Sequence, residues 1–488
     1  MAQGIMARKS VAEIMDSGDA EGHQLSRTLG PLSITAMGVG AIIGAGIFVL
    51  TGTAAAQYAG PSIMLSFVLA AVACAFVGLC YAELAAMLPV CGSSYTYTYA
   101  TLGEVFAWII GWDLILEYAM GAATVAVGWS GYVVSLLHNV GIDVPPAFAA
   151  APGTMIKLAD GGTVEGIVNL PAALIVLALT ALLVQGTKES ARLNNIMVAV
   201  KLVVVVAFIA LGAAYVSTAN WHPFVPANTG EFGHFGWSGI LRGSAVVFFA
   251  FIGFDAVSTA AQEARRPQRD MPIGILGSLA VCTVLYIAVA AVLTGLVPYA
   301  ELNVADPIAK GVDAIGLTWF SVLIKLGALT GLTTVILVLL YGQSRIFYTM
   351  AHDGLLPGLF SRIHPRLQTP WLSQMLIGGI VAVVAALTPI GILGEMVSIG
   401  TLFAFILVCG SVIYLRRTDA EVPRPFRVPS VPLVPVLGIL FCLLLMLALP
   451  LVTWLRLAVW LVIGLAIYFL YGRSHSVLRH PAPGLAKP

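Results

Sequence analysis

Two long apolar stretches of this chain are each interrupted near the middle by glycine, and this constrains the fold more than any other feature. The first interruption is Gly44-Ala45-Gly46, and the second is Gly253 between two large apolar residues. Unpaired backbone N–H and C=O groups are costly inside a bilayer, because no water is present to bond them. Irregular backbone at that depth indicates a cavity enclosed by protein. A matched pair of such segments, one in each half of a chain, is typical of a carrier's substrate site.

The composition places the chain in the lipid bilayer. Hydrophobic residues make up 59% and charged residues 10% of the 488 positions, which excludes an ordinary soluble protein. Apolar runs of about 20 residues recur along the whole length, so we predict an all-α polytopic membrane protein. About twelve spans are predicted, at 32–54, 60–88, 104–137, 167–186, 190–217, 237–262, 273–297, 318–350, 372–388, 391–415, 431–450 and 453–472.

The distribution of Lys and Arg predicts the orientation. One set of connections carries nearly all of these residues, whereas the opposite set holds little beyond Lys157 and Lys310. The positive-inside rule then places both termini in the cytoplasm of a cell with the chain in its plasma (inner) membrane. The first apolar run begins near Leu32 and continues without a small-residue cleavage site, so no removable signal peptide is expected. The net charge of +1 gives no sign of a nucleic-acid partner.

The interruptions fall in the first and sixth predicted spans, which start on opposite sides of the membrane. This predicts two inverted repeats of five helices each, with spans one and six unwound and two peripheral helices appended. The predicted domains are a cytoplasmic tail at 1–31, repeats at 32–217 and 237–415, appended helices at 431–472 and a cytoplasmic tail at 473–488. The connection at 138–166 is predicted to be a loop, and 352–369 a short amphipathic surface helix.

A broken helix exposes N–H groups at the start of one half and C=O groups at the end of the other. The helix dipole adds a positive potential at the N–H groups and a negative potential at the C=O groups. A zwitterion such as an amino acid needs both, its carboxylate at N–H groups and its ammonium at carbonyls. The predicted substrate-binding residues are Ile42, Ile43, Gly44, Ala45 and Gly46 in span one, Phe249, Ala250 and Ile252 in span six, and Glu117 in span three. The alternative is that the glycines are ordinary helix-packing contacts. The aromatic residues around Gly253 either face lipid or gate the cavity.

The residues around the breaks resemble those of the amino acid–polyamine–organocation superfamily, in its cationic amino acid transporter-like branch. The resemblance is carried by 37–48, by 254–275 with its Glu263-Ala264-Arg265-Arg266-Pro267 run, and by 342–357. It implies a five-plus-five inverted repeat of the LeuT-like type and an amino acid held by the unwound helices. Ala45 departs from the pattern, since relatives often carry a hydroxyl there. Twelve spans resemble the prokaryotic members, whereas mammalian members have fourteen.

Lys201 lies well inside the fifth predicted span. A lysine at such a depth costs about 2.5–3.5 kcal/mol on insertion scales, so it needs a reason. We predict that its ammonium replaces a coupling sodium ion and donates to span-one carbonyls and to the hydroxyls of Thr333 and Thr334. Members of the superfamily that are coupled to protons carry a lysine at this position, and the resemblance therefore implies proton coupling. The alternative is a lysine that snorkels to the interface.

Other charges also lie within the predicted spans. Glu117 either faces the cavity, where it favours a cationic substrate side chain, or pairs with a polar group on another helix. Asp255 is predicted to stabilise the broken backbone by capping the second half-helix, and the alternative is that it contacts the substrate. Six charged residues lie closer to the span ends and are expected to snorkel or to form interfacial pairs. They are Glu83, Asp113, Arg242, Lys325, Glu395 and Arg456.

The predicted function is secondary active import of L-amino acids with protons, by alternating access. An exchanger and a non-transporting sensor of the same fold are the alternatives. The sequence shows no metal-spaced His/Cys cluster, nucleophile elbow or phosphate loop, so we predict neither an enzyme nor a bound cofactor or metal. It also lacks the charged rings or carbonyl filter expected of a channel. Small neutral and cationic amino acids both remain open as substrates, and a monomer is favoured.

Overall fold

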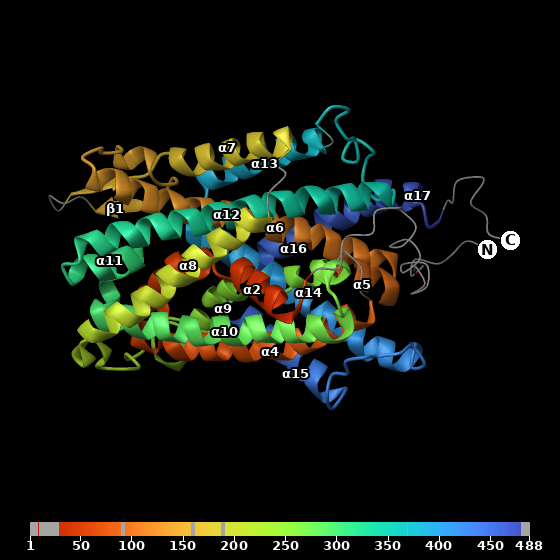
Figure 1. Ribbon diagram of the computed structural model, residues 1–488, viewed down its shortest axis with the longest axis horizontal. Helices are drawn as coiled ribbons and strands as arrows, with labels where there is room; N and C mark the ends of the chain where they lie inside the picture. Colours follow the sequence, from red (N-terminus) through yellow and green to blue (C-terminus); the bar gives the residue numbers. More distant parts are fainter. Residues whose placement is uncertain are drawn as a thin grey trace.

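The structure of the protein is a computed structural model, which describes residues 8, 29–88, 93–157, 162–186, 191–367 and 369–479. The helices of the first half are α2 Pro31–Ile42, α3 Thr51–Ala54, α4 Ile63–Met87, α5 Ser93–Thr101, α6 Glu104–Asn139, α7 Leu170–Gln185 and α8 Ala191–Gly212. The second half contains α9 Gly236–Val247, α10 Pro267–Leu296, α11 Pro307–Ala314, α12 Thr318–His352, α13 Trp371–Leu387, α14 Ile390–Thr418, α15 Leu433–Leu447, α16 Leu451–Ile467 and α17 Arg473–His475. Most of the long helices run along the long axis of the molecule, with α11 near one end and α5 and α17 near the other (Figure 1).

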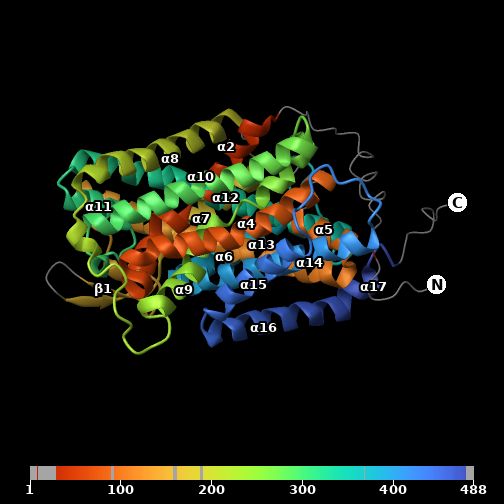
Figure 2. The same ribbon diagram turned by 90° about the horizontal axis from the view of Figure 1, so that it is seen from below.

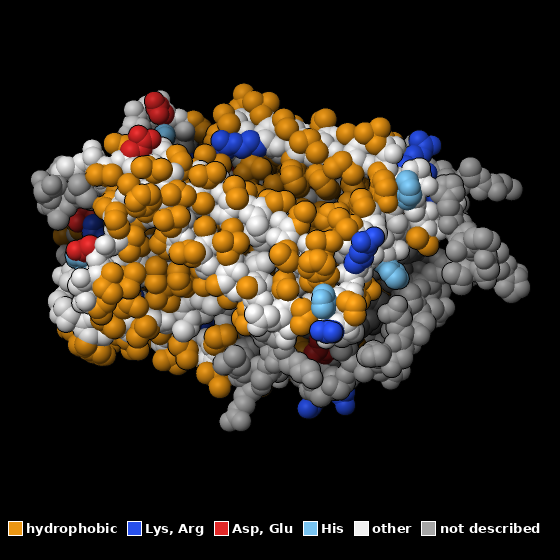
Figure 3. All heavy atoms as spheres, turned by 90° about the horizontal axis from the view of Figure 1, so that it is seen from above, with side chains coloured by type: hydrophobic (Ala, Val, Ile, Leu, Met, Phe, Trp, Pro, Cys, Tyr) orange, Lys and Arg blue, Asp and Glu red, His pale blue; other side chains and the backbone are white. Residues whose placement is uncertain are grey.

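The described residues contain eight helices that are long and apolar enough to cross a membrane. Four shorter apolar helices accompany them, namely α2, α7, α13 and α15. One of the eight runs from Gly46 to Met87 and joins the second half of predicted span one to predicted span two, although the backbone bends at Gly60, whose φ is +61°. Hydrophobic side chains cover most of one face of the molecule, with few charges among them (Figure 3). The chain is thus an integral membrane protein, and the count of twelve spans stays a prediction.

Helices at corresponding positions of the two halves pack against each other. The pairs are α4 with α10, α6 with α12 and α7 with α13. The first and last of these pairs are visible as neighbours in Figure 1. The two interrupted segments also meet, through the π-helical turn η1 Gly46–Leu50 and the 3₁₀ turn η7 Phe248–Phe251. Such one-to-one pairing is what two related halves would produce.

Local chemistry sets the ends of helix α7. Asn169 precedes the helix, and its side-chain oxygen accepts a hydrogen bond from the Ala172 N–H at 3.1 Å. Pro171 occupies the first turn, where a missing N–H costs nothing. Gly186 ends the helix in the left-handed region with φ +81°, which favours glycine. Asn169 and Pro171 thus set the start of the helix, and Gly186 explains why it ends at Gln185, near the 186 predicted from the apolar run.

Two connections differ from the sequence prediction. The connection at 138–166 was predicted to be a loop, but it contains an antiparallel hairpin of β1 Met155–Lys157 and β2 Thr163–Glu165. The predicted surface helix at 352–369 is wrong, because the described residues after His352 form turns. Gly354, with φ +76°, ends α12: its N–H bonds to Ala351 O and the Leu355 N–H bonds to Met350 O, as in a Schellman motif. Of the apolar residues in this segment, Leu355 and Leu356 are buried, whereas Leu359 and Ile363 are exposed.

The charges near the helix ends mostly form the expected pairs. Glu83 accepts two hydrogen bonds from Arg416, at 2.9 and 2.7 Å, and one from the Val428 N–H at 2.6 Å. Arg242 pairs with Glu395. Lys325 lies 3.7 Å from the Asp313 carboxylate. Because Glu83, Arg242 and Lys325 each have a partner of opposite charge, the desolvation cost of these residues is partly offset.

The end of the described chain folds back onto α6. Glu104, fully buried at the start of α6, accepts hydrogen bonds from Tyr468 at 2.7 Å, from Arg479 at 2.7 Å and from the Ser476 hydroxyl. Helix α16 lies at the outer edge of the bundle (Figure 2), and Trp460 stacks on Trp112 of α6 with ring centroids 4.5 Å apart. Helix α16 and the segment after it are thus bound to α6, whereas α15, the other helix of the last pair, packs against α14 and α4.

Candidate functional site

The first break separates α2 from the π-helical turn that follows it. Helix α2 ends at Ile42, and Ile43 adopts an extended conformation with ψ of 102°. The next backbone hydrogen bond across the break joins the Phe48 N–H to the Gly44 carbonyl at 3.3 Å. Because the first N–H groups of a helical segment have no partner within that segment, those of Gly44, Ala45 and Gly46 face the break. Binding of a substrate carboxylate by these N–H groups stays a prediction.

The second break follows the 3₁₀ turn η7. Ile252 is extended, with ψ of 137°, and Gly253 has φ of +114°, a conformation that favours glycine. The segment that resumes after it, η8 Ala256–Glu263, is a 3₁₀ helix rather than the predicted α-helix. Asp255 accepts a hydrogen bond from the Gly253 N–H at 3.2 Å, so its carboxyl stabilises the break itself. In the described residues no side-chain cap hydrogen bond is made to η8, and the prediction of a helix cap is therefore wrong in its detail.

The two breaks touch each other through their glycines. A Cβ atom placed on Gly46 would lie 2.2 Å from the Cα atom of Ala250, and one on Gly253 would lie 2.9 Å from the Ala41 carbonyl oxygen. Such distances leave no room for a side chain. Glycine at both positions therefore allows the backbones of the two broken segments to meet deep inside the bundle.

Lys201 binds the first break from the α8 side. Its ammonium donates to the Gly40 carbonyl and, at 3.1 Å, to the Ile43 carbonyl, and its side chain is only 1% exposed. Gly331 of α12 lies against the lysine stem, where a Cβ would be 3.4 Å from two of its carbons. The lysine therefore does not snorkel, and the predicted contact with span-one carbonyls is present.

The predicted hydroxyl partners of Lys201 are bonded elsewhere. Thr333 donates to the Leu329 carbonyl at 2.7 Å and accepts from Trp129 at 3.0 Å, while Thr334 donates to the Gly331 carbonyl at 2.6 Å. Among the described residues neither hydroxyl is hydrogen-bonded to Lys201. Of the contacts predicted for Lys201, the structure thus shows those with the carbonyls of the first break, and a role for the two threonines stays a prediction.

A tyrosine that sequence reasoning missed joins the two breaks. The Tyr286 hydroxyl of α10 lies 2.9 Å from the Ile42 carbonyl and 2.8 Å from the Ala250 carbonyl. Both carbonyls were predicted to receive the substrate ammonium, and a third predicted acceptor, Phe249 O, receives the Ile252 N–H at 3.2 Å. The only sequence signal was a tyrosine in the middle of an apolar span, which in one sequence looks like an ordinary packing residue.

Replacing Tyr286 with Phe is expected to destabilise the protein, because a buried carbonyl would lose its donor. The usual cost of such a loss is about 1–3 kcal/mol. The midpoint of thermal unfolding in detergent should fall, and so should the initial rate of uptake into proteoliposomes. The same change at the exposed Tyr215 should alter neither quantity. A Tyr286 variant equal to the wild type in both measurements would show that the hydroxyl does not hold the breaks together.

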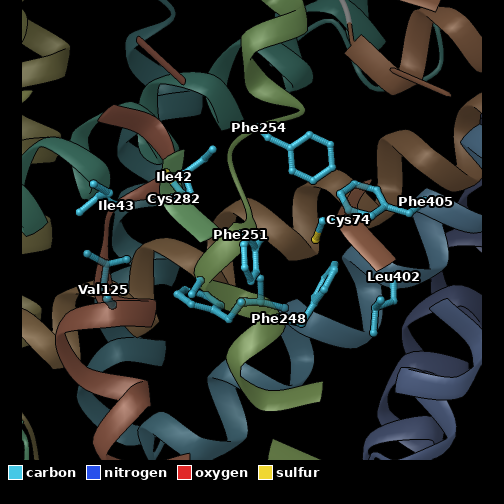
Figure 4. Close-up of a cluster of buried hydrophobic side chains, with 14 of the residues drawn as sticks. Ile42, Ile43, Cys74, Val125, Phe248, Phe251, Phe254, Cys282, Leu402 and Phe405 are labelled. Carbon is cyan, nitrogen blue, oxygen red and sulfur yellow. The ribbon is translucent and has the colours of Figure 1, made fainter. Parts of the chain in front are cut away.

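The aromatic residues of the second break are buried and do not face lipid. Figure 4 shows Phe254 beside Phe405 of α14, and the Phe248 ring lies 5.8 Å from the Phe405 ring. The Phe254 and Phe405 rings lie 5.1 Å apart, and the Phe254 ring also makes an edge contact with Tyr81 at 5.7 Å. The alternative that these residues are lipid-facing bulk is therefore wrong. They form an apolar wall between the second break and α14.

Glu117 is 1% exposed, and its Oε1 atom has no hydrogen-bond partner among the described residues. It lies on α6, with Asp113 one turn earlier on the same helix face. The predicted alternatives for Glu117 were a cavity-facing carboxyl and a pair with a polar group on another helix, and the Thr401 hydroxyl of α14 lies beside it as such a group.

Comparison with known proteins identifies the family. A family model described as amino acid permease matches residues 29–470 of the chain. The chain belongs to the amino acid permease family. The permease is 49% identical over 479 residues to the branched-chain amino acid permease BcaP of Bacillus subtilis, a match that covers 98% of this chain and 100% of the relative. It is 45% identical to the methylthioribose transporter of the same organism, over 96% of the chain and 98% of the relative.

A plant relative supports the predicted branch. The permease is 39% identical to the vacuolar cationic amino acid transporter 4 of Arabidopsis thaliana, over 86% of the chain and 68% of the relative. The predicted superfamily and its cationic amino acid transporter-like relatives are thus confirmed. The family and these relatives are transporters, so the prediction that the permease is not an enzyme is also confirmed.

Proposed function

We propose that the permease imports L-amino acids together with protons across the plasma membrane by alternating access between two inverted five-helix repeats. The observation that supports this best is the meeting of two broken segments around a buried lysine that donates to the first break. Orphan N–H groups of the first break suit a carboxylate, and nearby carbonyls suit an ammonium. The one-to-one packing of α4, α6 and α7 with α10, α12 and α13 supports the repeat. Both termini are proposed to be cytoplasmic.

The proposed substrate class is an amino acid with an apolar side chain. The residues around the breaks are predominantly buried apolar groups, including Val125, Phe248 and Leu402 (Figure 4), and a desolvated apolar wall favours an apolar ligand. The similarity to a branched-chain amino acid permease agrees with this choice. A cationic amino acid is the second candidate, because the Glu117 Oε1 atom, which has no hydrogen-bond partner among the described residues, offers a buried acceptor, and several relatives are named cationic amino acid transporters.

Uptake by the purified permease in proteoliposomes tests this proposal. We expect radiolabelled leucine to accumulate when the outside is made acidic and to leak back when an ionophore collapses the pH gradient. Arginine and methylthioribose are tested in parallel, since relatives are named for cationic amino acids and for methylthioribose. Stabilisation of the folded permease against heat by each compound reports binding independently of flux. Binding without flux would indicate a sensor, and counterflow without accumulation would indicate an exchanger.

A further inference from the structure

Asp113 is a fully buried carboxyl group that takes no part in the site described above. Its exposed fraction is 0%, and neither of its carboxylate oxygens has a hydrogen-bond partner among the described residues. It lies in the part of α6 that packs against α14, where a Cβ on Gly400 would be 3.0 Å from the Asp113 Oδ1 atom. The sequence prediction of snorkelling or interfacial pairing is therefore wrong for this residue.

The surroundings of Asp113 require a neutral carboxyl group. No ion pair joins Asp113 or Glu117 to a basic residue in the described chain, although every other buried carboxylate discussed above has a donor. An ionised carboxylate without a partner costs several kcal/mol in a buried site. Asp113 and Glu117 are also one helical turn apart, so two negative charges would repel each other. In this conformation, we therefore infer that Asp113 and Glu117 are both protonated.

A hydroxyl group on the facing helix points to a proton-binding cluster rather than to a pair of acids alone. Thr401 of α14 is 0% exposed and directly follows Gly400, the glycine that lies against the Asp113 carboxyl. The Thr401 hydroxyl lies beside the Glu117 carboxyl. Hydroxyl groups can both donate and accept, so they can follow a carboxyl group as it gains and loses a proton.

We propose that Asp113 is a proton-relay carboxyl between Glu117 and the end of α6 that holds Glu104. At about 1.5 Å per residue, Asp113 lies about 13 Å along the helix axis from Glu104, and Glu117 about 6 Å further in. When α6 and α14 separate and water enters from the Glu104 side, protonated Asp113 gives its proton to water and becomes a carboxylate. The Glu117 acid then transfers its proton to the Asp113 carboxylate, and Asp113 is neutral again. This step rests on the proposed proton coupling.

The titratable groups around this relay are few. Glu117 and Tyr118 share α6 with Asp113, Asp255 acts on Glu117 from the second break, and Glu117 in turn acts on Tyr81 of α4. Helix α14 presents the non-titratable Gly400 and Thr401. The described neighbours therefore supply acids and phenols but no cation, which favours proton transfer over ion pairing.

An Asp113→Asn variant tests the relay, because asparagine has the shape of the neutral acid and cannot carry a proton. We expect counterflow of labelled substrate, which needs no net proton release, to stay within about twofold of the wild type. The initial rate of uptake driven by a pH gradient should fall by about a hundredfold, the lower range of what a positioned proton donor contributes. An equal loss in both assays, or no loss in either, would overturn the proposal and leave Asp113 a packing residue. Absence of pH-driven uptake in the wild type would instead count against the proposed function.

Infrared difference spectroscopy gives a readout that does not depend on transport. The wild type should show the carbonyl stretch of a protonated carboxylic acid that disappears in Asp113→Asn and shifts in heavy water. If that band is identical in the variant, Asp113 is ionised and the proposal fails. Asp113→Ser, a smaller polar variant, serves in the same measurements should the asparagine variant not fold.

Discussion

Replacing Lys201 with Met is expected to abolish the accumulation of substrate driven by a pH gradient. One pH unit corresponds to about 1.4 kcal/mol, so each coupled proton should allow the wild type to concentrate substrate about tenfold per unit of gradient. Without a proton carrier at the break, the ratio of inside to outside concentration should fall to about one, the value at which no gradient is coupled. The measurement is steady-state uptake into proteoliposomes at several imposed gradients.

The expected loss follows from what the lysine contacts. Its ammonium is 1% exposed and donates to the Gly40 and Ile43 carbonyls, which flank the point where α2 ends. A charged ammonium holds these carbonyls in place, whereas a neutral amine binds them less strongly. Gain and loss of one proton can therefore change how firmly the first break is held. Methionine has a similar length, no charge and no donor, and it removes that change while filling the space.

A second buried lysine provides the matched control. Lys325 of α12 is also 1% exposed, but it pairs with Asp313 at 3.7 Å, and among the described residues no hydrogen bond joins it to either break. Lys325→Met should keep the dependence of accumulation on the pH gradient, even if its stability falls. Accumulation by Lys201→Met equal to that of the wild type would exclude this lysine as the proton carrier. Counterflow that persists in Lys201→Met would show that the lysine couples transport to protons without being needed for binding.

Much of the helical framework could be predicted from the sequence. Runs of apolar residues give the positions of α4, α6, α10, α12 and α14 to within a few residues, because each helix must satisfy its own backbone in the bilayer. Connections were predicted less well, since their conformation depends on tertiary contacts. Gly354 is one example: a Cβ there would lie 2.1 Å from the carbonyl oxygen of His475, a residue far away in the sequence.

The candidate site could be predicted only at residues whose type is unusual inside an apolar membrane span. Lys201 is conspicuous because a charge in an apolar run needs a partner, and the glycine breaks are conspicuous because a helix does not need them. Tyr286 gave no such signal, since tyrosine is a common packing residue and its two carbonyl partners come from distant segments. Asp113 was misjudged for a related reason. One sequence does not show whether a carboxyl near a span end meets a basic residue or, as here, a glycine of α14.

The Gly46→Ala variant is expected to lose both transport and much of its stability. The added methyl group would lie 2.2 Å from the Ala250 Cα atom and 2.7 Å from the Ala250 nitrogen. These are backbone atoms, so no side chain can rotate away and the two broken segments must move apart. Overpacking of a well-packed core costs about 1–3 kcal/mol, and a clash with backbone should lie at the upper end of that range. The midpoint of thermal unfolding in detergent and the initial rate of uptake report the two effects.

Alanine variants of two other glycines distinguish the effect of this clash from the general effect of adding a methyl group. A methyl group added to Gly379 of α13 would have no neighbouring atom within 4 Å, so Gly379→Ala should leave stability equal or slightly higher. Gly44 belongs to the same break as Gly46, but its added methyl group would meet Val335 at an ordinary 3.4 Å. Gly44→Ala should therefore fold like the wild type and bind substrate more weakly, because the methyl group shields N–H groups that we propose bind the carboxylate. If Gly46→Ala were as stable and as active as Gly379→Ala, the two breaks would not need to touch for transport.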